Sequence, residues 1–422
     1  MKEVLCIAFS CPPILDPQSI LLAKMLGPLR ERGFRVQVLG LDPETCITRT
    51  DESLNRLLPP DPEPLRVPAS ERRLWWRAVS RCLPSVVHLP DKHFPAILRA
   101  VKAGVALHAR RPVGLLFSWA QYHSCSLVAL RLKKILDLPW VAHFSDPWRA
   151  SPYPRRTIHE RWINAKLEEA VIAAADAVVF VNEETLDSTM ARYPRAWREK
   201  TAVIPHCFDP HLYPSKTSAH AGMVIRHIGN FYGHRGPGRL LEAIARLRGA
   251  DESYLQGVRL EFVGGVGPAQ GKEVQQLGLG QVVHFRPAVA YLESLREMRE
   301  ADVLLLVEDA TTRNLFLPSK LIDYLGAGRP VFAITATSGP AARLLTDTGD
   351  VVVPPDDVDG IASALRRCIG RFHLGELSDF RRSPESIAPF HSRTTVSALG
   401  SLFNQVLQRR TWEGSRLLDA GQ

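Results

Sequence analysis

The chain has 422 residues, of which 45% are hydrophobic and 23% are charged, and its formal net charge is +9. This length favours two domains of roughly 200 residues each, and the composition is that of a globular protein, which excludes collagen-like and disordered chains. No apolar run reaches the roughly 18 residues that a membrane-spanning helix needs, so we expect none.

The positive charge lies almost entirely in the first half of the chain. Residues 1–205 hold 29 basic and 21 acidic side chains, whereas residues 206–422 hold 24 and 23. We therefore expect the first half to face an anionic partner such as a membrane surface or a phosphate-bearing acceptor; the alternative is a merely soluble basic surface. Nucleic acid is disfavoured as a partner, because no recognised binding module accompanies the charge. The seven scattered cysteines, without a Cys-x-x-Cys pair, predict reduced thiols of a cytoplasmic protein and neither disulfides nor a zinc site.

The first half alternates short apolar runs with helical patterns. We expect its strands at Val4–Phe9, Arg35–Leu41, Val113–Phe117, Trp140–Phe144, Ala177–Val181 and Ala202–Ile204. Asp16 before Pro17 predicts a helix start and Gly33 a stop, while Pro28 predicts that this helix is kinked or short. Strands that are apolar throughout are typical of a parallel sheet with helices on both faces. The pattern predicts a doubly wound α/β domain over residues 1–205.

A segment rich in proline and arginine, residues 44–112, interrupts this domain. Within it, residues 71–81 form a basic helical pattern with two adjacent tryptophans: Arg72, Arg73, Trp75, Trp76 and Arg77. Such a helix can lie on an anionic membrane face with its indoles at the level of the headgroups. The alternative is that the tryptophans pack on the domain and the arginines are simply solvated.

The alternation begins again after residue 222. We expect strands at Met223–Gly229, Val258–Gly264, Val282–Arg286, Asp302–Val307, Pro330–Ile334 and Val351–Val353. Residues 223–390 are therefore a second doubly wound domain, and residues 206–222, which lack apolar periodicity, are the expected linker. Residues 391–422 are a C-terminal helix and tail, in which residues 394–410 carry an apolar stripe that must pack on a partner surface.

The segment from Phe316 to Pro330 carries the clearest chemical signal. Ser319 follows a proline at a predicted helix start, and Lys320 lies in the first turn. A helix N-terminus offers free N–H groups and partial positive charge, so with Lys320 it makes a diphosphate site. Asp323, three residues on, is placed to accept hydrogen bonds from a ribose. The alternative is a solvated Lys–Asp surface helix.

Two glycine-containing loops follow strands of the second domain. The first holds Gly229, Asn230 and Arg235, and the second holds Gly264 and Gly265. Glycine lets the backbone approach a ligand closely, and an arginine can bind phosphate through two hydrogen bonds. Neither loop has the G-x-G-x-x-G or Walker A spacing, so dehydrogenase and P-loop functions are disfavoured.

Polar residues also follow two strands of the first domain. His143 lies at the end of one strand, and Asp146 follows it, where a carboxylate could take the proton of an acceptor hydroxyl. The alternative for Asp146 is a turn-capping role before Pro147. Pro13, Asp16 and Gln18 belong to the loop after the first strand and are the matching acceptor-side residues.

The order of these segments resembles the retaining group 1 (family-four-like) glycosyltransferases of GT-B architecture that build bacterial polysaccharides. The resemblance is carried by the segments Cys11–Pro13, Pro139–Arg149, Phe180–Thr185, Val203–Asp209, Gly229–Arg235 and Leu317–Pro330. It implies two Rossmann-like domains facing a cleft, with the acceptor on the first and a nucleotide-sugar donor on the second. Arg235 and Lys320 would then hold the donor diphosphate, and Asp323 would bind its ribose.

Two positions depart from the family pattern. Position 315 is Leu where the family has a glutamate that contacts the sugar, which leaves the donor sugar open. Ser145 stands where many relatives have histidine, so the base role of Asp146 is one hypothesis and proton transfer to the leaving phosphate is the other. No Asp-x-Asp or His/Cys cluster occurs, so we expect no metal cofactor.

Together these features predict a hexosyltransferase that moves a sugar from a nucleotide diphosphate sugar to a glycan or lipid-linked acceptor. Asp146, Arg235 and Lys320 are its predicted catalytic residues. We expect it in the cytoplasm or peripherally on the inner face of the cytoplasmic membrane. Two alternatives remain: a sugar-nucleotide epimerase of the same fold, and an inactive glycosyltransferase-like partner subunit.

Overall fold

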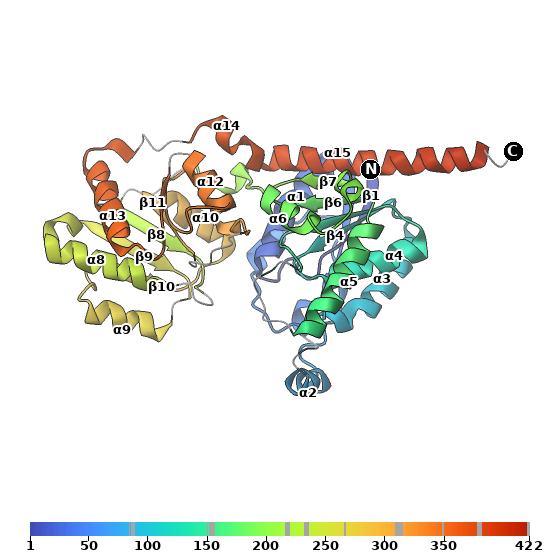
Figure 1. The fold of residues 1–422 in the computed structure, drawn as a ribbon, viewed down its shortest axis with the longest axis horizontal. Helices are drawn as coiled ribbons and strands as arrows, with labels where there is room; N and C mark the ends of the chain where they lie inside the picture. The colour runs from blue at the N-terminus through green and yellow to red at the C-terminus, as the bar shows by residue number, and fades with distance from the viewer. Residues whose placement is uncertain are drawn as a thin grey trace. The chain divides into compact units, whose positions relative to one another are not determined.

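The computed structural model describes residues 1–83, 85, 89–149, 151, 157–215, 220–231, 236–265, 267–308, 315–347, 350–377 and 382–419. The chain divides into two compact units (Figure 1). The first unit comprises Met1–Cys207 together with Ser392–Gln422, and the second comprises Phe208–His391. Residues 208–222 thus belong to the second unit, and the C-terminal segment returns to the first.

The first unit is built on a seven-stranded parallel sheet with the order β3-β2-β1-β4-β5-β6-β7. Its strands are β1 (Lys2–Ile7), β2 (Phe34–Leu41), β3 (Leu65–Val67), β4 (Leu115–Ala120), β5 (Trp140–Phe144), β6 (Ala177–Phe180) and β7 (Thr201–Val203). The six strands expected in this half are present, with ends shifted by up to three residues. The edge strand β3 is too short to leave a periodic signal, so the sequence did not predict it.

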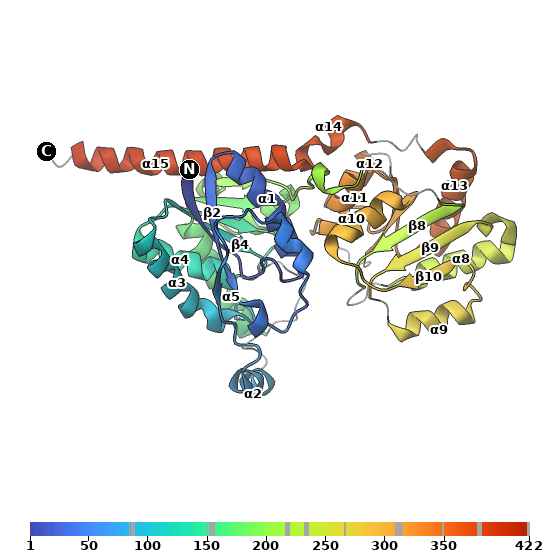
Figure 2. The same cartoon turned by 180° about the vertical axis from the view of Figure 1, so that it is seen from behind.

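Helices cover both faces of this sheet (Figures 1 and 2). The helices of this unit are α1 (Pro17–Glu31), α2 (Leu74–Cys82), α3 (Ile97–Arg110), α4 (Ser124–Leu136), α5 (Ile158–Ala174), α6 (Glu183–Met190), α7 (Arg195–Arg198) and α15 (Ser392–Asp419). Helix α2 projects away from the sheet and covers neither face (Figures 1 and 2). Along β1, Val4 and Cys6 pack in the cluster that includes α1 and α15, whereas Leu5 and Ile7 pack in the cluster that includes α3 and α4. Burial on both faces explains why the strand is apolar throughout.

The first helix begins where its sequence predicts. The Asp16 side chain accepts a hydrogen bond from the backbone N–H of Gln18 at 2.9 Å, and Pro17 is the first helical residue. Gly33 ends the turn after the helix with φ +84°. The helix continues through Pro28 to Glu31, so the expectation of a shorter helix is wrong. Its buried face is retained on both sides of Pro28, which favours helix continuation despite the lost hydrogen bond.

The C-terminal helix α15 packs on the first unit through the apolar stripe read from the sequence. Val396, Leu399, Phe403 and Val406 are each at most 3% exposed. The Phe403 ring lies edge-on to Phe34, with centroids 5.4 Å apart. Full burial of such side chains stabilises by about 2 kcal/mol each, which is enough to attach the tail to this unit.

The second unit holds a six-stranded parallel sheet with the order β10-β9-β8-β11-β12-β13. The strands are β8 (Met223–Ile228), β9 (Val258–Val263), β10 (Val283–Arg286), β11 (Val303–Val307), β12 (Val331–Ile334) and β13 (Val351–Val353). The helices are α8 (Gly238–Ala250), α9 (Pro268–Gln276), α10 (Tyr291–Glu300), α11 (Ser319–Ala327), α12 (Pro340–Asp347), α13 (Val358–His373) and α14 (Pro384–Ile387). All six strands match the expected ones, and the predicted pair of Rossmann-like units is confirmed.

Each sheet has one point where the strand order reverses. In the first unit the reversal lies between β1 and β4, and in the second it lies between β8 and β11. Loops on either side of such a switch point run in opposite directions and leave a crevice beyond the carboxyl ends of the strands, where ligands bind. The two switch points are therefore the first places to look for sites.

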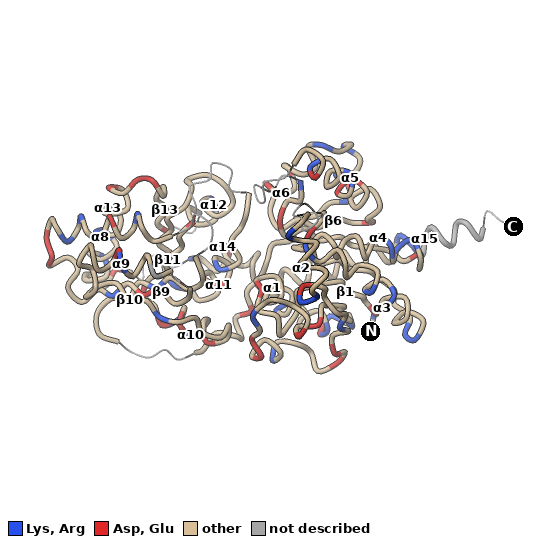
Figure 3. Tube along the Cα trace, turned by 90° about the horizontal axis from the view of Figure 1, so that it is seen from below, with Lys and Arg blue, Asp and Glu red and all other residues tan. Residues whose placement is uncertain are grey.

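Two further facts concern the distribution of charge and the length and apolarity of the helices. Both signs of charge are spread along the trace of each unit (Figure 3). Among the helices within the described ranges, none combines the length and the apolarity required to traverse a bilayer.

Candidate functional site

Two glycines form the backbone edge of the second switch point. Gly229 follows β8 with φ +126°, and Gly264 follows β9 with φ +146°, conformations that residues with a Cβ rarely adopt. A Cβ on Gly264 would lie 2.3 Å from the carbonyl oxygen of Gly229. The two loops approach so closely that only glycine fits at position 264.

Asn230 ties these two loops together. Its side-chain oxygen accepts a hydrogen bond from the backbone N–H of Gly265 at 2.7 Å. A Cβ on Gly265 would lie 2.8 Å from that same oxygen, so a side chain there would displace Asn230. Gly229, Asn230, Gly264 and Gly265, which the sequence selected as separate signals, thus form one connected edge.

Lys320 lies beside this edge, in the first turn of α11. A Cβ on Gly229 would lie 3.0 Å from its Nζ atom, which places the ammonium group against the glycine backbone. Ser319 begins the helix after Pro318, whose side chain cannot cap it, so the first N–H groups of α11 depend on other partners. The cation and the helix N-terminus both lie at the carboxyl end of β8, as a site for an anionic ligand requires.

His227 is a site residue that the sequence analysis missed. Its Nε2 atom lies 3.4 Å from Nζ of Lys320, and its Nδ1 atom lies 2.9 Å from the carbonyl oxygen of Leu305. Because that oxygen can only accept, Nδ1 carries the proton and Nε2 offers its lone pair to the ammonium group. Burial, and then the charge of Lys320, hold the pKa of His227 well below its ordinary value, so the imidazole is neutral.

The same carbonyl also holds the helix that carries Lys320. The hydroxyl of Tyr324 on α11 donates to the Leu305 oxygen at 3.2 Å and accepts from the backbone N–H of Ile228 at 3.1 Å. These contacts attach α11 to β8 and β11 on both sides of the switch point. The position of Lys320 is therefore set by buried hydrogen bonds rather than by a solvated surface.

Asp323 lies one turn further along α11 and is only 6% exposed. Its carboxylate accepts a hydrogen bond from the Tyr291 hydroxyl at 3.2 Å, and its backbone carbonyl accepts one from Tyr213 at 2.9 Å. A ribose at this carboxylate would compete with Tyr291. The other predicted phosphate ligand, Arg235, lies outside the described residues.

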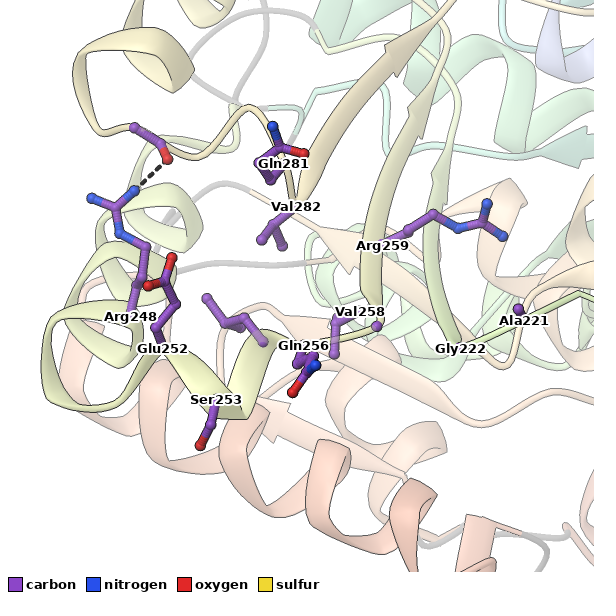
Figure 4. Close-up of a pocket in the computed structure, with 13 residues that line it drawn as sticks. Ala221, Gly222, Arg248, Glu252, Ser253, Gln256, Val258, Arg259, Gln281 and Val282 are labelled. Carbon is purple, nitrogen blue, oxygen red and sulfur yellow. Dashed lines mark hydrogen bonds between the residues drawn. The ribbon is translucent and has the colours of Figure 1, made fainter.

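A wide depression on the second unit lies away from this site (Figure 4). It is lined by Gly222 and Gln256, which precede β8 and β9, by Val258, the first residue of β9, and by Arg248, which donates to the carbonyl of Gly278. These positions are at the amino ends of the strands. Ligands of doubly wound sheets bind at the opposite ends, so we do not assign the donor to this depression.

In the first unit, the loop that carries Asp146 is anchored by the tryptophan two residues later. Trp148 is fully buried; its indole N–H donates to the side-chain oxygen of Asn164 on α5 at 2.7 Å, and its ring stacks on His123. The next backbone N–H, of Arg149, donates to Glu168 at 2.8 Å. The Asp-Pro-Trp motif thus holds Asp146 at the carboxyl end of β5.

Asp146 and Asp16 influence one another electrostatically. Burial, and then the charge of Asp16, raise the pKa of Asp146 to about 6. Burial also raises the pKa of Asp16, although its N-cap hydrogen bond from Gln18 and the charge of Lys92 oppose the shift. A carboxylate with a raised pKa is a suitable proton acceptor near neutral pH.

The other predicted acceptor-side residues, Gln18, His143 and Pro13, are all buried. Gln18 and His143 are 6% and 3% exposed, and the Ser145 hydroxyl connects them, donating to Gln18 at 2.7 Å and lying 3.4 Å from Nδ1 of His143. Burial lowers the pKa of His143 well below its usual range, and its ring stacks on Trp119. Pro13 is buried and its carbonyl accepts from the backbone N–H of Asp51 at 2.8 Å. Gln18, His143 and Pro13 therefore support the loops rather than line an open surface.

One family profile matches the chain. Residues 222–371, which span the second switch point, match the family described as Glycosyl transferases group 1. No curated protein sequence is similar enough to count as a match.

Solved structures of similar fold extend over both units. Sucrose-phosphate synthase from Thermosynechococcus elongatus is 17% identical, with a TM-score of 0.66 over 97% of this chain and 100% of that one. Anabaena HepE in complex with UDP and glucose is 16% identical, with a TM-score of 0.67 over 96% and 100%. A putative UDP-N-acetylglucosamine 2-epimerase from Listeria monocytogenes is 12% identical, with a TM-score of 0.64 over 96% and 98%. At these identities the likeness establishes the GT-B fold.

Proposed function

We propose that this chain of GT-B fold is a group 1 glycosyltransferase and that it transfers a sugar from a nucleotide diphosphate sugar to a saccharide or membrane-associated acceptor. One observation carries the proposal: the ammonium group of Lys320 lies against the backbone of Gly229, at the N-terminus of α11 and at the switch point of the matched domain. This is where a diphosphate is best stabilised.

In this proposal Lys320 neutralises charge that grows on the leaving diphosphate. A preorganised cation at such a position lowers the barrier because it stabilises the transition state more than the bound donor. Arg235 is proposed to share this role, and Asp323 to bind the ribose. The proposed stabilisation uses side-chain cations, and a metal cofactor is not part of the proposal.

We propose a retaining reaction, for which the resemblance in the first-domain and second-domain motifs is the support. Asp146 is the proposed proton acceptor for the acceptor hydroxyl, since its pKa of about 6 leaves it ionised at neutral pH and still basic. HepE was solved with UDP and glucose, so UDP-glucose is the first donor to test. Synthesis of a bacterial polysaccharide or glycan is the proposed setting.

The exposed side chains of α2 support the proposal that the acceptor is carried on an anionic membrane. Leu74, Trp75 and Leu83 are 80%, 51% and 60% exposed, whereas Trp76 is 4% exposed and packs edge-on against Phe94. The two adjacent tryptophans thus divide their roles, one fixing the helix and the other facing solvent. Among the nearby basic side chains, Arg72 donates to the Cys46 carbonyl, and Arg73 and Arg77 are exposed. An exposed indole with basic neighbours suits the headgroup region of a membrane.

A sugar-nucleotide epimerase is the second candidate, because the Listeria protein with that description shares the fold over 96% of the chain. An epimerase needs no acceptor, so the acceptor-side carboxylates and the exposed face of α2 would have no role in its reaction. Incubating the protein with UDP-N-acetylglucosamine alone separates the two functions. Formation of the epimer without an acceptor would replace the transferase proposal.

The donor site is tested by thermal unfolding with UDP-, GDP-, ADP- and dTDP-sugars. A donor at 100 times its Kd stabilises the protein by about 2.7 kcal/mol, and Lys320→Ala is expected to remove most of that gain. Lys272→Ala, which removes an exposed lysine from α9 of the same unit, is the matched control and should keep it. Failure of every nucleotide to raise the unfolding temperature would contradict the proposal and favour an inactive partner subunit. Leu315, at the position where the family has glutamate, is the observation that suggests this alternative.

A further inference from the structure

A small polar cavity lies at the switch point of the first unit. Its volume is about 20 Å³, which is room for one water molecule or one hydroxyl group. Phe9 and Leu41, at the carboxyl ends of β1 and β2, form part of its apolar wall. The polar side chains that line it come from separate segments of the chain: Ser10, Asp16, Thr48, Glu71, Lys92, His93 and Tyr122.

The one cation in the cavity lining is already matched by a carboxylate. Nζ of Lys92 lies 2.6 Å from one oxygen of Glu71, and the other oxygen accepts the backbone N–H of Ile47 at 2.8 Å. Burial opposes ionisation of Glu71 and is the largest single influence on it. The hydrogen bonds from Lys92 and from the backbone of Ile47, together with the charge of Lys92, outweigh burial and hold the pKa of Glu71 below its usual value. The positive charge of Lys92 is therefore largely balanced by Glu71, which leaves little net attraction for an anionic ligand.

His93 has unused hydrogen-bonding capacity. It is only 5% exposed, and its Nδ1 atom has no hydrogen-bond partner within the described part of the chain. Burial lowers the pKa of His93 to about 4, so the ring is neutral. It is held edge-on to Tyr122, with centroids 4.3 Å apart, and to Phe9 at 6.1 Å. A buried polar atom without a partner is costly, and a ligand hydroxyl in the cavity would satisfy it.

The surrounding charge selects against anions. Asp16 and Glu71 line the cavity, and Asp91 lies beside it, where its carboxylate accepts two hydrogen bonds from Ser124, each 2.8 Å long. Asp146 lies close enough to Asp16 for the charge of Asp16 to raise its pKa. When it is ionised, Asp146 therefore adds to the negative charge near the cavity. Lys92 is the single cation among the residues that line the cavity, so the carboxylates outnumber the positive charges. A phosphate here would meet net negative charge, whereas a neutral hydroxyl would meet acceptors and a neutral imidazole.

We propose that this cavity is a subsite for the acceptor and that it receives a hydroxyl group of an uncharged sugar, hydrogen-bonded to His93 beside Asp16. The inference rests on the proposed function and adds the class of acceptor: its recognised end is a neutral saccharide, not a phosphate-bearing one. Tyr122 presents its ring beside the same position and adds apolar contact for the sugar's C–H groups. The positive charge of the first half then acts elsewhere on its surface.

The test uses the full-length protein with UDP present and measures binding by saturation-transfer NMR. The probes are the methyl glycosides of glucose, galactose and mannose and the 6-phosphates of the same sugars. At least one neutral glycoside is expected to bind at least tenfold more tightly than its 6-phosphate. His93→Gln is expected to weaken that binding at least tenfold.

The matched control is His206→Gln. His206 is a second buried histidine of the same unit with a lowered pKa, and it does not line the cavity. This variant should bind the glycoside as the unaltered protein does. If His93→Gln does not fold, the comparison of neutral and phosphorylated probes on the unaltered protein still decides.

Three results would overturn the inference: equal or tighter binding of a 6-phosphate, unchanged binding by His93→Gln, and no binding of any neutral glycoside. Failure of the proposed function is a different result. It appears as an absence of thermal stabilisation by every nucleotide sugar, which depends on the second unit and not on this cavity.

Discussion

The two units have the same strand order around their switch points but opposite chemistry there. In the second unit the position is lined by the backbone of Gly229 and Gly264 and carries the cation of Lys320. In the first unit the position is lined by side chains and is dominated by the carboxylates of Asp16 and Asp146. A shared topology determines where ligands bind, and the local side chains determine what kind of ligand is stable there.

The difference between the two switch points suits two substrates that need opposite kinds of charge around them. A diphosphate needs positive charge and close backbone N–H groups, which glycine loops and a helix N-terminus provide. An acceptor hydroxyl needs a group that takes a proton, which a carboxylate with a raised pKa provides. The following predictions test this division of roles, beginning with the largest expected effect.

Lys320→Ala is expected to lower kcat/KM for sugar transfer by about 10³-fold, or about 4 kcal/mol, because it removes the cation that we propose stabilises the departing diphosphate. Steady-state kinetics with the donor found by thermal screening measure the effect. Lys272→Ala should remain within twofold of the unaltered enzyme. A loss below tenfold in Lys320→Ala would show that the second switch point does not act through this cation.

Asp146→Asn is expected to lower kcat by about 10²-fold above pH 7, because an amide cannot accept the acceptor's proton. For the unaltered enzyme, kcat/KM should rise with pH through about 6, since Asp146 is protonated and inactive below its pKa of about 6 and ionised above it. The variant should lack this rise. Asp187→Asn, at an exposed aspartate of α6, is the control. A rate independent of pH between 5 and 7 in the unaltered enzyme would assign the proton to another acceptor.

Gly264→Ala is expected to lower the free energy of unfolding by about 2–3 kcal/mol, because its φ of +146° is strained for alanine and the new Cβ would meet the Gly229 carbonyl. Urea unfolding measures the change. Gly271→Ala, in the helix α9 where a Cβ meets no neighbouring atom, should leave stability unchanged or raise it slightly. Equal stability of the two variants would contradict the close approach of the loops.

His227→Phe is expected to weaken nucleotide binding about tenfold, because it retains the stacking on Phe231 but loses the hydrogen bond to Leu305 and the contact with Lys320. Calorimetric titration with the donor nucleotide measures the loss. The affinity of the unaltered protein should show no inflection due to His227 between pH 6 and 8, because burial and the charge of Lys320 hold the pKa of this residue well below its ordinary value. An inflection near 6.5 that disappears in the variant would mean that His227 carries charge.

Trp75→Ala is expected to reduce binding to vesicles containing anionic lipid about threefold to tenfold, because it removes an exposed indole from α2. Sedimentation with vesicles of phosphatidylglycerol and phosphatidylcholine measures the effect. Trp162→Ala, which removes a 64% exposed indole from α5 of the same unit, is the control. Equal losses in both variants would remove α2 as the specific contact and leave only general surface affinity.

The sequence predicted the second switch point better than the first. Glycines after strands, and a lysine after a proline at a helix start, are local signals whose meaning depends on neighbouring residues only. The structure places Gly229, Gly264 and Lys320 together at one edge. Their contacts with His227 were not predictable in the same way, because a histidine within an apolar strand has no pattern that reveals its partner.

Glu71, Lys92 and His93 show the opposite case. They lie in the segment of residues 44–112, where no apolar periodicity indicates which way a side chain faces, and they are far apart in sequence from Asp16. The edge strand β3 escaped prediction because three residues are too few to show a period, and the Trp148–Asn164 hydrogen bond because it joins residues 16 positions apart.

The amino-acid sequence alone determined the two doubly wound units, the N-cap at Asp16 and the apolar stripe of α15, because each depends on local periodicity or on a single backbone preference. Only the tertiary structure decided that α15 packs on the first unit, that His227 is a neutral neighbour of Lys320, and that His93 lines a cavity with Asp16. Those outcomes depend on burial and on contacts between distant segments. Both the pKa of a side chain and its free hydrogen-bonding capacity are set by those contacts, so they exist only once the chain has folded.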